Sequence, residues 1–134
     1  MIQRTGKRPQ GVRAVIFDLD GTLLDTVPDL GASANVALRQ FAMPERPLGD
    51  YRALIGHGIR NLVRQAVPEG TTEERFEQVL AFYLAYYPEH SAEQTVVFPG
   101  IRELIAMLAL RCYTLGVLSN KTETTTQRLI AHFF

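Results

Sequence analysis

Two short apolar runs stand out from longer stretches in which apolar residues recur every three or four positions. The first run contains Val15, Ile16 and Phe17 and ends abruptly in polar residues. The second, residues 115–118, ends in the same way. Short apolar runs of this kind are typical of strands in a parallel sheet, which are buried on both faces. The pattern predicts two such strands, each followed at its carboxyl end by polar side chains.

Most of the remaining chain has the spacing of amphipathic helices. Thr71 and Glu74 have the spacing of a capping box at a helix start, and Pro88 is expected to end the helix that follows. The expected helices cover about residues 28–41, 59–67, 76–87, 101–108 and 122–134, with a short element at 49–54.

The two predicted strands lie far apart in the sequence. Parallel strands need only about a dozen connecting residues, whereas this connection is several times longer. The surplus predicts a helical domain, residues 26–92, inserted into a core formed by residues 12–25 and 93–134. Residues 1–11 are expected to be a flexible tail. The predicted fold class is therefore α/β, a partial core of parallel strands with a helical insertion.

Composition narrows the possible functions. The 134 residues suffice for one ordinary domain, and 46% are hydrophobic, so a packed core is expected. Fourteen basic and fourteen acidic side chains balance, which gives no electrostatic reason to expect nucleic acid or a membrane as partner. The single cysteine, Cys112, excludes an intramolecular disulfide and is expected to be packed in or near the core. A reducing, cytoplasmic location is the default.

The chemistry begins with Asp18 and Asp20, which follow the first predicted strand. Residues two apart on a strand face the same side, so their carboxylates can converge and repel each other unless a cation or a shared proton intervenes. Mg²⁺ prefers such hard oxygen ligands together with phosphate oxygens. One aspartate could then attack phosphorus while the other transfers protons. A simple turn cap is the weaker interpretation of the pair.

Other residue types suited to phosphate lie near the strand ends. Ser119 and Asn120 follow the second strand, and the carboxyl ends of parallel strands meet at one edge of a sheet. Gly21 and Thr22 could complete a cradle for phosphate oxygens, together with the amides at the start of the last helix. We therefore expect these side chains to meet the carboxylates.

These residues resemble the motifs of a known family. Asp18-Leu19-Asp20-Gly21-Thr22-Leu23 resembles the first motif of the haloacid-dehalogenase superfamily of phosphotransferases, and Ser119 after a strand resembles its second. The helical insertion resembles the mobile cap of that family. Four further segments resemble those of bacterial phosphoglycolate phosphatases: residues 22–30, 55–58, 97–100 and 119–121.

The resemblance implies catalytic roles. Asp18 would be the nucleophile and a Mg²⁺ ligand, and Asp20 would be the general acid/base and bind the metal through its backbone carbonyl. Ser119 and Asn120 would hold the phosphoryl group that is transferred. The implied cofactor is Mg²⁺, and the implied intermediate is an aspartyl-phosphate.

The resemblance also implies a substrate. His57, between Gly56 and Gly58, and the nearby Arg60 would face the part of the substrate that is not phosphate. A small phosphorylated acid such as 2-phosphoglycolate is the expected substrate. A pyrophosphatase and a sugar-phosphate phosphatase are the neighbouring alternatives.

One departure from the family pattern changes these expectations. Relatives carry a third motif with a lysine and a fourth with acidic residues, and the sequence up to Phe134 contains neither. Lys121 directly follows Ser119 and Asn120, so it is assigned to the second motif and is not expected to replace that lysine. Activity of this chain is therefore expected to be weak or absent, and a catalytically inactive remnant is the alternative. An incomplete core also predicts self-association.

Overall fold

The strand before Asp18 pairs in parallel with the strand before Ser119, as the sequence predicts. In the computed structural model, which describes residue 11 and residues 13–134, β1 (Ala14–Phe17) aligns with β4 (Thr114–Val117). Phe17 lies opposite Val117 at the end of the register. The polar residues that follow the two strands therefore leave the sheet at the same edge. Apart from Gly11, the expected tail over residues 1–11 lies outside the described residues.

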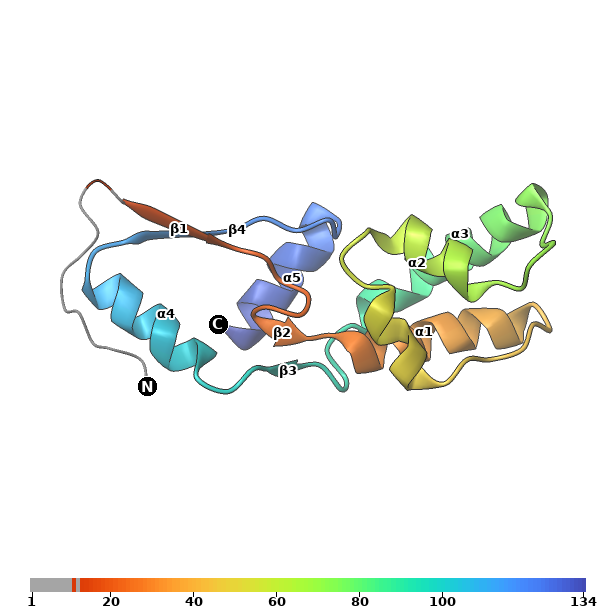
Figure 1. Ribbon diagram of the computed structural model, residues 1–134, viewed down its shortest axis with the longest axis horizontal. Coiled ribbons are helices and arrows are strands. Elements are labelled where there is room, and N and C mark those ends of the chain that lie inside the picture. The colour runs from red at the N-terminus through yellow and green to blue at the C-terminus, as the bar shows by residue number, and fades with distance from the viewer. Residues whose placement is uncertain (1–10, 12) are drawn as a thin grey trace.

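The molecule has two parts, which Figure 1 shows at opposite ends of its long axis. The strand part holds β1 and β4, and the helical part is the long connection between them. The mixed α/β fold class, with parallel strands and an inserted helical segment, is confirmed. The elements of the helical part are α1 (Val27–Gln40), the 3-10 helix η1 (Leu48–Ala53), α2 (Ile59–Ala66) and α3 (Glu73–His90).

A second, antiparallel pair of strands joins the two parts. β2 (Leu24–Asp25) leads into the helical part and pairs with β3 (Val96–Val97), which leads out of it. The sequence pattern does not indicate this pair, because two residues are too few to show a strand period. The pair brings both crossings between the parts side by side.

Each part has its own apolar core. In the helical part, α1 and α3 pack together and bury the aromatic stripe of α3, including Phe76, Tyr83 and Tyr87. The strand part contains α4 (Ile101–Leu110) and α5 (Glu123–Phe133). In the core of the strand part, Leu129 of α5 is buried against Leu19, Leu23 and Leu24, which follow β1.

Both sequence-predicted boundaries of α3 are wrong. Thr72 is the N-cap, since its hydroxyl accepts from the Arg75 amide, whereas the Thr71 hydroxyl donates to the Pro68 carbonyl. The helix also continues past Pro88 to His90. A proline removes one helical hydrogen bond, and the buried aromatic stripe that ends at Tyr87 keeps this last turn packed.

The prediction that β1 is buried on both faces is also wrong. Ile16 is 68% exposed and Leu118, just after β4, is 73% exposed, because the parallel sheet has only two strands in the described part of the chain. Cys112, expected to be packed, is exposed in a left-handed turn after α4. Among the described residues, no helix combines the length and the apolar character needed to cross a membrane.

Candidate active site

The loop after β1 fixes the two carboxylates. The carbonyl of Leu19, whose side chain is fully buried, accepts hydrogen bonds from the amides of Thr22, Leu23 and Leu24. Gly21 turns the chain at a φ of 76°, a left-handed conformation that glycine adopts without strain. The result is a tight turn that holds its backbone rigidly beside the strand end.

Asp18 and Asp20 open into one small cavity between the two parts of the molecule. Its volume is about 30 Å³, room for about two water molecules. The strand part contributes the two carboxylates with Asn120 and Lys121. The helical part and its loops contribute apolar side chains and glycines: Leu30, Leu54, Ile55, Gly56, Gly58, Ile59 and Leu62.

Lys121 lies at the centre of this arrangement. Its ammonium is 3.0 Å from Oδ1 of Asp20 and donates to the Tyr87 hydroxyl at 2.9 Å, while only 2% of its side chain is exposed. Burial lowers the pKa of Lys121, and the nearby Asp20 carboxylate opposes that shift. The sequence pattern places Lys121 in the second motif only. Lys121 follows β4, whose end lies beside the end of β1 and therefore beside the two carboxylates. This position was the sequence signal for its contact with Asp20.

Two more contacts order the site. The Thr26 hydroxyl donates to Oδ1 of Asp20 at 2.7 Å, so Thr26 and Lys121 hold the same carboxylate oxygen. The Asn120 amide donates to the carbonyl of Gly56 at 2.7 Å, which joins the strand part to the 54–58 loop of the helical part. The 54–58 loop therefore lies over the carboxylates and forms one wall of the cavity.

The other predicted site residues do not line this cavity. The Ser119 hydroxyl accepts a hydrogen bond from the Lys121 amide. Ser119 lines an apolar groove beside β4 and α5. Thr22 is exposed on the turn, and a Cβ at the neighbouring Gly21 would lie 3.5 Å from the Ile55 side chain. His57 is exposed between the two glycines of the loop.

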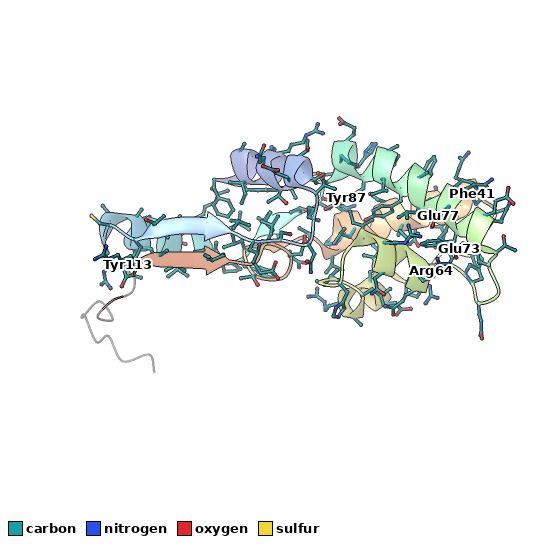
Figure 2. All side chains as sticks on the ribbon, turned by 90° about the horizontal axis from the view of Figure 1, so that it is seen from above. Phe41, Arg64, Glu73, Glu77, Tyr87 and Tyr113 are labelled. Atoms are coloured by element: carbon teal, nitrogen blue, oxygen red, sulfur yellow. The ribbon has the colours of Figure 1, made fainter. Side chains whose placement is uncertain are left out.

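Arg60 points away from the cavity, into an ion-pair network between α2 and α3. Its guanidinium pairs with Glu77 and lies 3.5 Å from Glu73, which also pairs with Arg64. Figure 2 shows Arg64, Glu73 and Glu77 together in the helical part, away from Tyr87 at the junction. In this arrangement, the Arg60 charge is matched by carboxylates, and Arg60 does not line the cavity.

The donor set fits a hard divalent cation. Among the described residues, no group of three or more histidine, cysteine, aspartate or glutamate side chains gathers around a point. Asp18 and Asp20 nevertheless open to the same cavity, and their hydrogen bonds within the described residues fall on Oδ1 of each. Mg²⁺ is commonly held by one or two carboxylates, with water and phosphate completing its shell. Two carboxylates are therefore enough for such a site.

Asp29 is a further residue that sequence reasoning missed. It lies in the first turn of α1, is 1% exposed, and accepts hydrogen bonds from the Gln94 amide and from both the amide and hydroxyl of Thr95. These partners are 65 and 66 residues away in the sequence, so no local pattern indicates them. Asp29 thereby ties the two crossings between the parts together.

The comparisons with known proteins agree with the motifs. A family model described as haloacid dehalogenase-like hydrolase matches residues 15–134. The phosphoglycolate phosphatase of Chromobacterium violaceum is 34% identical over 116 residues, which cover 84% of this chain and 52% of that protein. The phosphoglycolate phosphatase of Pseudomonas putida is 38% identical over 116 residues, covering 83% of this chain and 42% of that protein.

Solved structures give the same result for the fold. A crystal structure from Haemophilus somnus 129PT, described as a predicted phosphoglycolate phosphatase, superposes with a TM-score of 0.82 at 28% identity. The match covers 91% of this chain and 57% of the other. The chain thus spans about half the length of the relatives it matches.

Proposed function

Because the chain belongs to the haloacid dehalogenase-like hydrolase family, we propose that it carries the nucleophile of a Mg²⁺-dependent phosphomonoesterase. The observation that supports this most strongly is the shared cavity of Asp18 and Asp20 at the carboxyl edge of β1 and β4. In open α/β sheets, ligands bind at this edge. The buried ammonium of Lys121 adds positive charge where a phosphate would approach.

The proposed reaction uses the two carboxylates in different roles. Asp18 attacks phosphorus, the ester P–O bond breaks, and the leaving alcohol oxygen takes a proton from Asp20. In the second half, Asp20 takes a proton from a water molecule whose oxygen attacks phosphorus. This attack breaks the bond to Asp18 and releases inorganic phosphate. Asp20 thus regains the proton that it gave to the alcohol.

Mg²⁺ is the proposed cofactor, and the Asp18 carboxylate and the backbone carbonyl of Asp20 would hold it, which leaves the Asp20 carboxyl group to transfer protons. When bound, it would neutralise charge so that a dianionic phosphate can approach a carboxylate. Asn120 donates to the Gly56 carbonyl in this arrangement, and once the 54–58 loop has moved away its amide can bind a phosphate oxygen. Ser119 and the first amides of α5 are proposed as further phosphate ligands.

The proposed substrate is a small phosphorylated acid such as 2-phosphoglycolate, after the relatives that carry the name phosphoglycolate phosphatase. Residues 26–92 would serve as a cap that closes over the cavity. The cap side of the cavity is lined by apolar side chains and loop glycines, which favours a small leaving group. We also propose a cytoplasmic location, since the only cysteine is free.

Beryllium trifluoride, which mimics the phosphoryl group on an aspartate, tests the nucleophile without turnover. With Mg²⁺ present, the chain is expected to give a bound ¹⁹F NMR signal. Asp18→Asn should lose this signal, and the exposed control Asp50→Asn should keep it. Phosphate release from 2-phosphoglycolate, glucose 6-phosphate and pyrophosphate then ranks the substrates. An unaltered chain with neither a bound signal nor phosphate release contradicts the proposal, as does an Asp18→Asn variant with both.

A further inference from the structure

The ammonium of Lys121 connects the two parts of the molecule. It bridges Asp20, in the loop after β1, and the hydroxyl of Tyr87, near the end of α3. The same ammonium lies 4.7 Å from the centre of the Tyr87 ring. A buried ammonium is costly unless its partners stay in place. Lys121 is therefore held from both sides, one in each part.

Tyr87 is itself fixed by the packing of the helical part. It is fully buried and stacks on Tyr83, with ring centres 5.5 Å apart and planes 16° from parallel. The Tyr83 hydroxyl in turn donates to the Leu30 carbonyl of α1 at 3.4 Å. That bond is long and therefore weak, so the ring packing of α3 on α1, which Tyr83→Phe keeps, places the Tyr87 hydroxyl. Figure 2 shows Tyr87 at the junction of the two parts.

On the other side, Lys121 contacts the Asp20 carboxylate. Lys121 and Thr26 both bind Oδ1, which turns Oδ2 of Asp20 to a fixed orientation. Thr26 is fully buried at the first crossing into the helical part. Both partners of Oδ1 are thus linked to the helical part. Thr26 is the N-cap of α1, and Lys121 contacts Tyr87 of α3.

We propose that Lys121 is a positioning residue that holds Asp20 in its reactive orientation, and that Tyr87 makes this orientation depend on how α3 is placed. The proposal rests on the proposed function, because the reactive role of Asp20 is taken from it. The contact itself does not depend on that function. Within the described residues the Tyr87 hydroxyl makes no hydrogen bond to Asp20, and Lys121 contacts both groups.

The first test follows the Asp20 carboxylate by NMR, in the 134-residue chain labelled with ¹³C at aspartate Cγ. Tyr87→Phe removes one hydroxyl and keeps the ring, and Tyr83→Phe is the matched control on the neighbouring ring. We expect Tyr87→Phe to displace the Asp20 resonance in the same direction as Lys121→Met. Tyr83→Phe should leave that resonance within its line width. An unmoved Asp20 resonance in Tyr87→Phe, or an equal displacement in Tyr83→Phe, overturns the proposal.

The second test separates positioning from general stability. With p-nitrophenyl phosphate and Mg²⁺, Tyr87→Phe is expected to lower kcat about tenfold, the effect of one lost hydrogen bond, with KM within about twofold. Tyr83→Phe should keep both constants. Equal losses of kcat in the two variants overturn the positioning role. If the unaltered chain has no turnover and no bound beryllium trifluoride, the proposed function fails, and the displacement of the Asp20 resonance still decides the coupling.

Discussion

Replacing Asp29 by asparagine tests whether one buried carboxylate holds the two crossings together. The change keeps the shape of the side chain and removes its charge. Asp29 now accepts from three donors at 2.7–3.0 Å, the amides of Gln94 and Thr95 and the Thr95 hydroxyl. In asparagine, one acceptor oxygen becomes an NH₂ group. That group would face backbone N–H donors in a site that is 1% exposed.

The size of the effect follows from two losses. A hydrogen bond to a charged group contributes about 1.5–3 kcal/mol, and a buried donor without a partner costs about 1–3 kcal/mol. We expect Asp29→Asn to lower the free energy of unfolding by about 3 kcal/mol. In a chain of this size, that corresponds to a fall in Tm of roughly 12 °C, at about 4 °C for each kcal/mol.

Urea unfolding measured by circular dichroism and tyrosine fluorescence gives this free energy, since the chain has no tryptophan. Asp50→Asn is the control, because Asp50 is exposed and the same loss of charge should change stability by less than about 0.5 kcal/mol. A loss in Asp29→Asn no larger than the control's would refute the reasoning. It would mean that the β2 and β3 pair alone holds the crossings.

Three further predictions concern packing, pH and the exposed sheet. Gly31→Ala should destabilise by about 1 kcal/mol in urea unfolding, because the gain in helix propensity (about 1 kcal/mol) is outweighed by overpacking (about 1–3 kcal/mol). Its Cβ would lie 2.8 Å from the buried Tyr51 ring, whereas the control Gly49→Ala meets nothing within 4 Å and should be unchanged or up to about 1 kcal/mol more stable. Burial raises the pKa of Tyr51 to about 12 and raises those of Tyr83 and Tyr87 as well, so the unfolded chain loses these protons first. Stability should therefore be fully present below about pH 10 and fall as pH rises toward 12, with a smaller fall in Tyr51→Phe; an equal fall in both proteins would contradict this. Sedimentation velocity should detect self-association through the exposed sheet, and Ile16→Lys with Leu118→Lys should shift the chain toward monomer; a monomeric unaltered chain would contradict it.

Local patterns predicted the elements around the site well. The apolar runs before Asp18 and Ser119 gave both parallel strands, because each run is set apart by the polar residues that follow it. Helical spacing gave α1, α2 and α4 nearly to their ends. It failed at Pro88, where the packing of Tyr83 and Tyr87 extends α3 beyond the point at which a proline usually ends a helix.

The sequence by itself determined the family, the α/β class and the pair Asp18 and Asp20, since motifs and periodicity are properties of neighbouring residues. Only the tertiary structure decided which distant groups meet them. It brought Lys121 to Asp20 and Tyr87, joined Asn120 to Gly56, and turned Arg60 toward Glu77. These contacts depend on how the helical part packs on the strand part. Burial and distance in three dimensions, and not spacing along the chain, therefore determine which charges lie beside the two carboxylates.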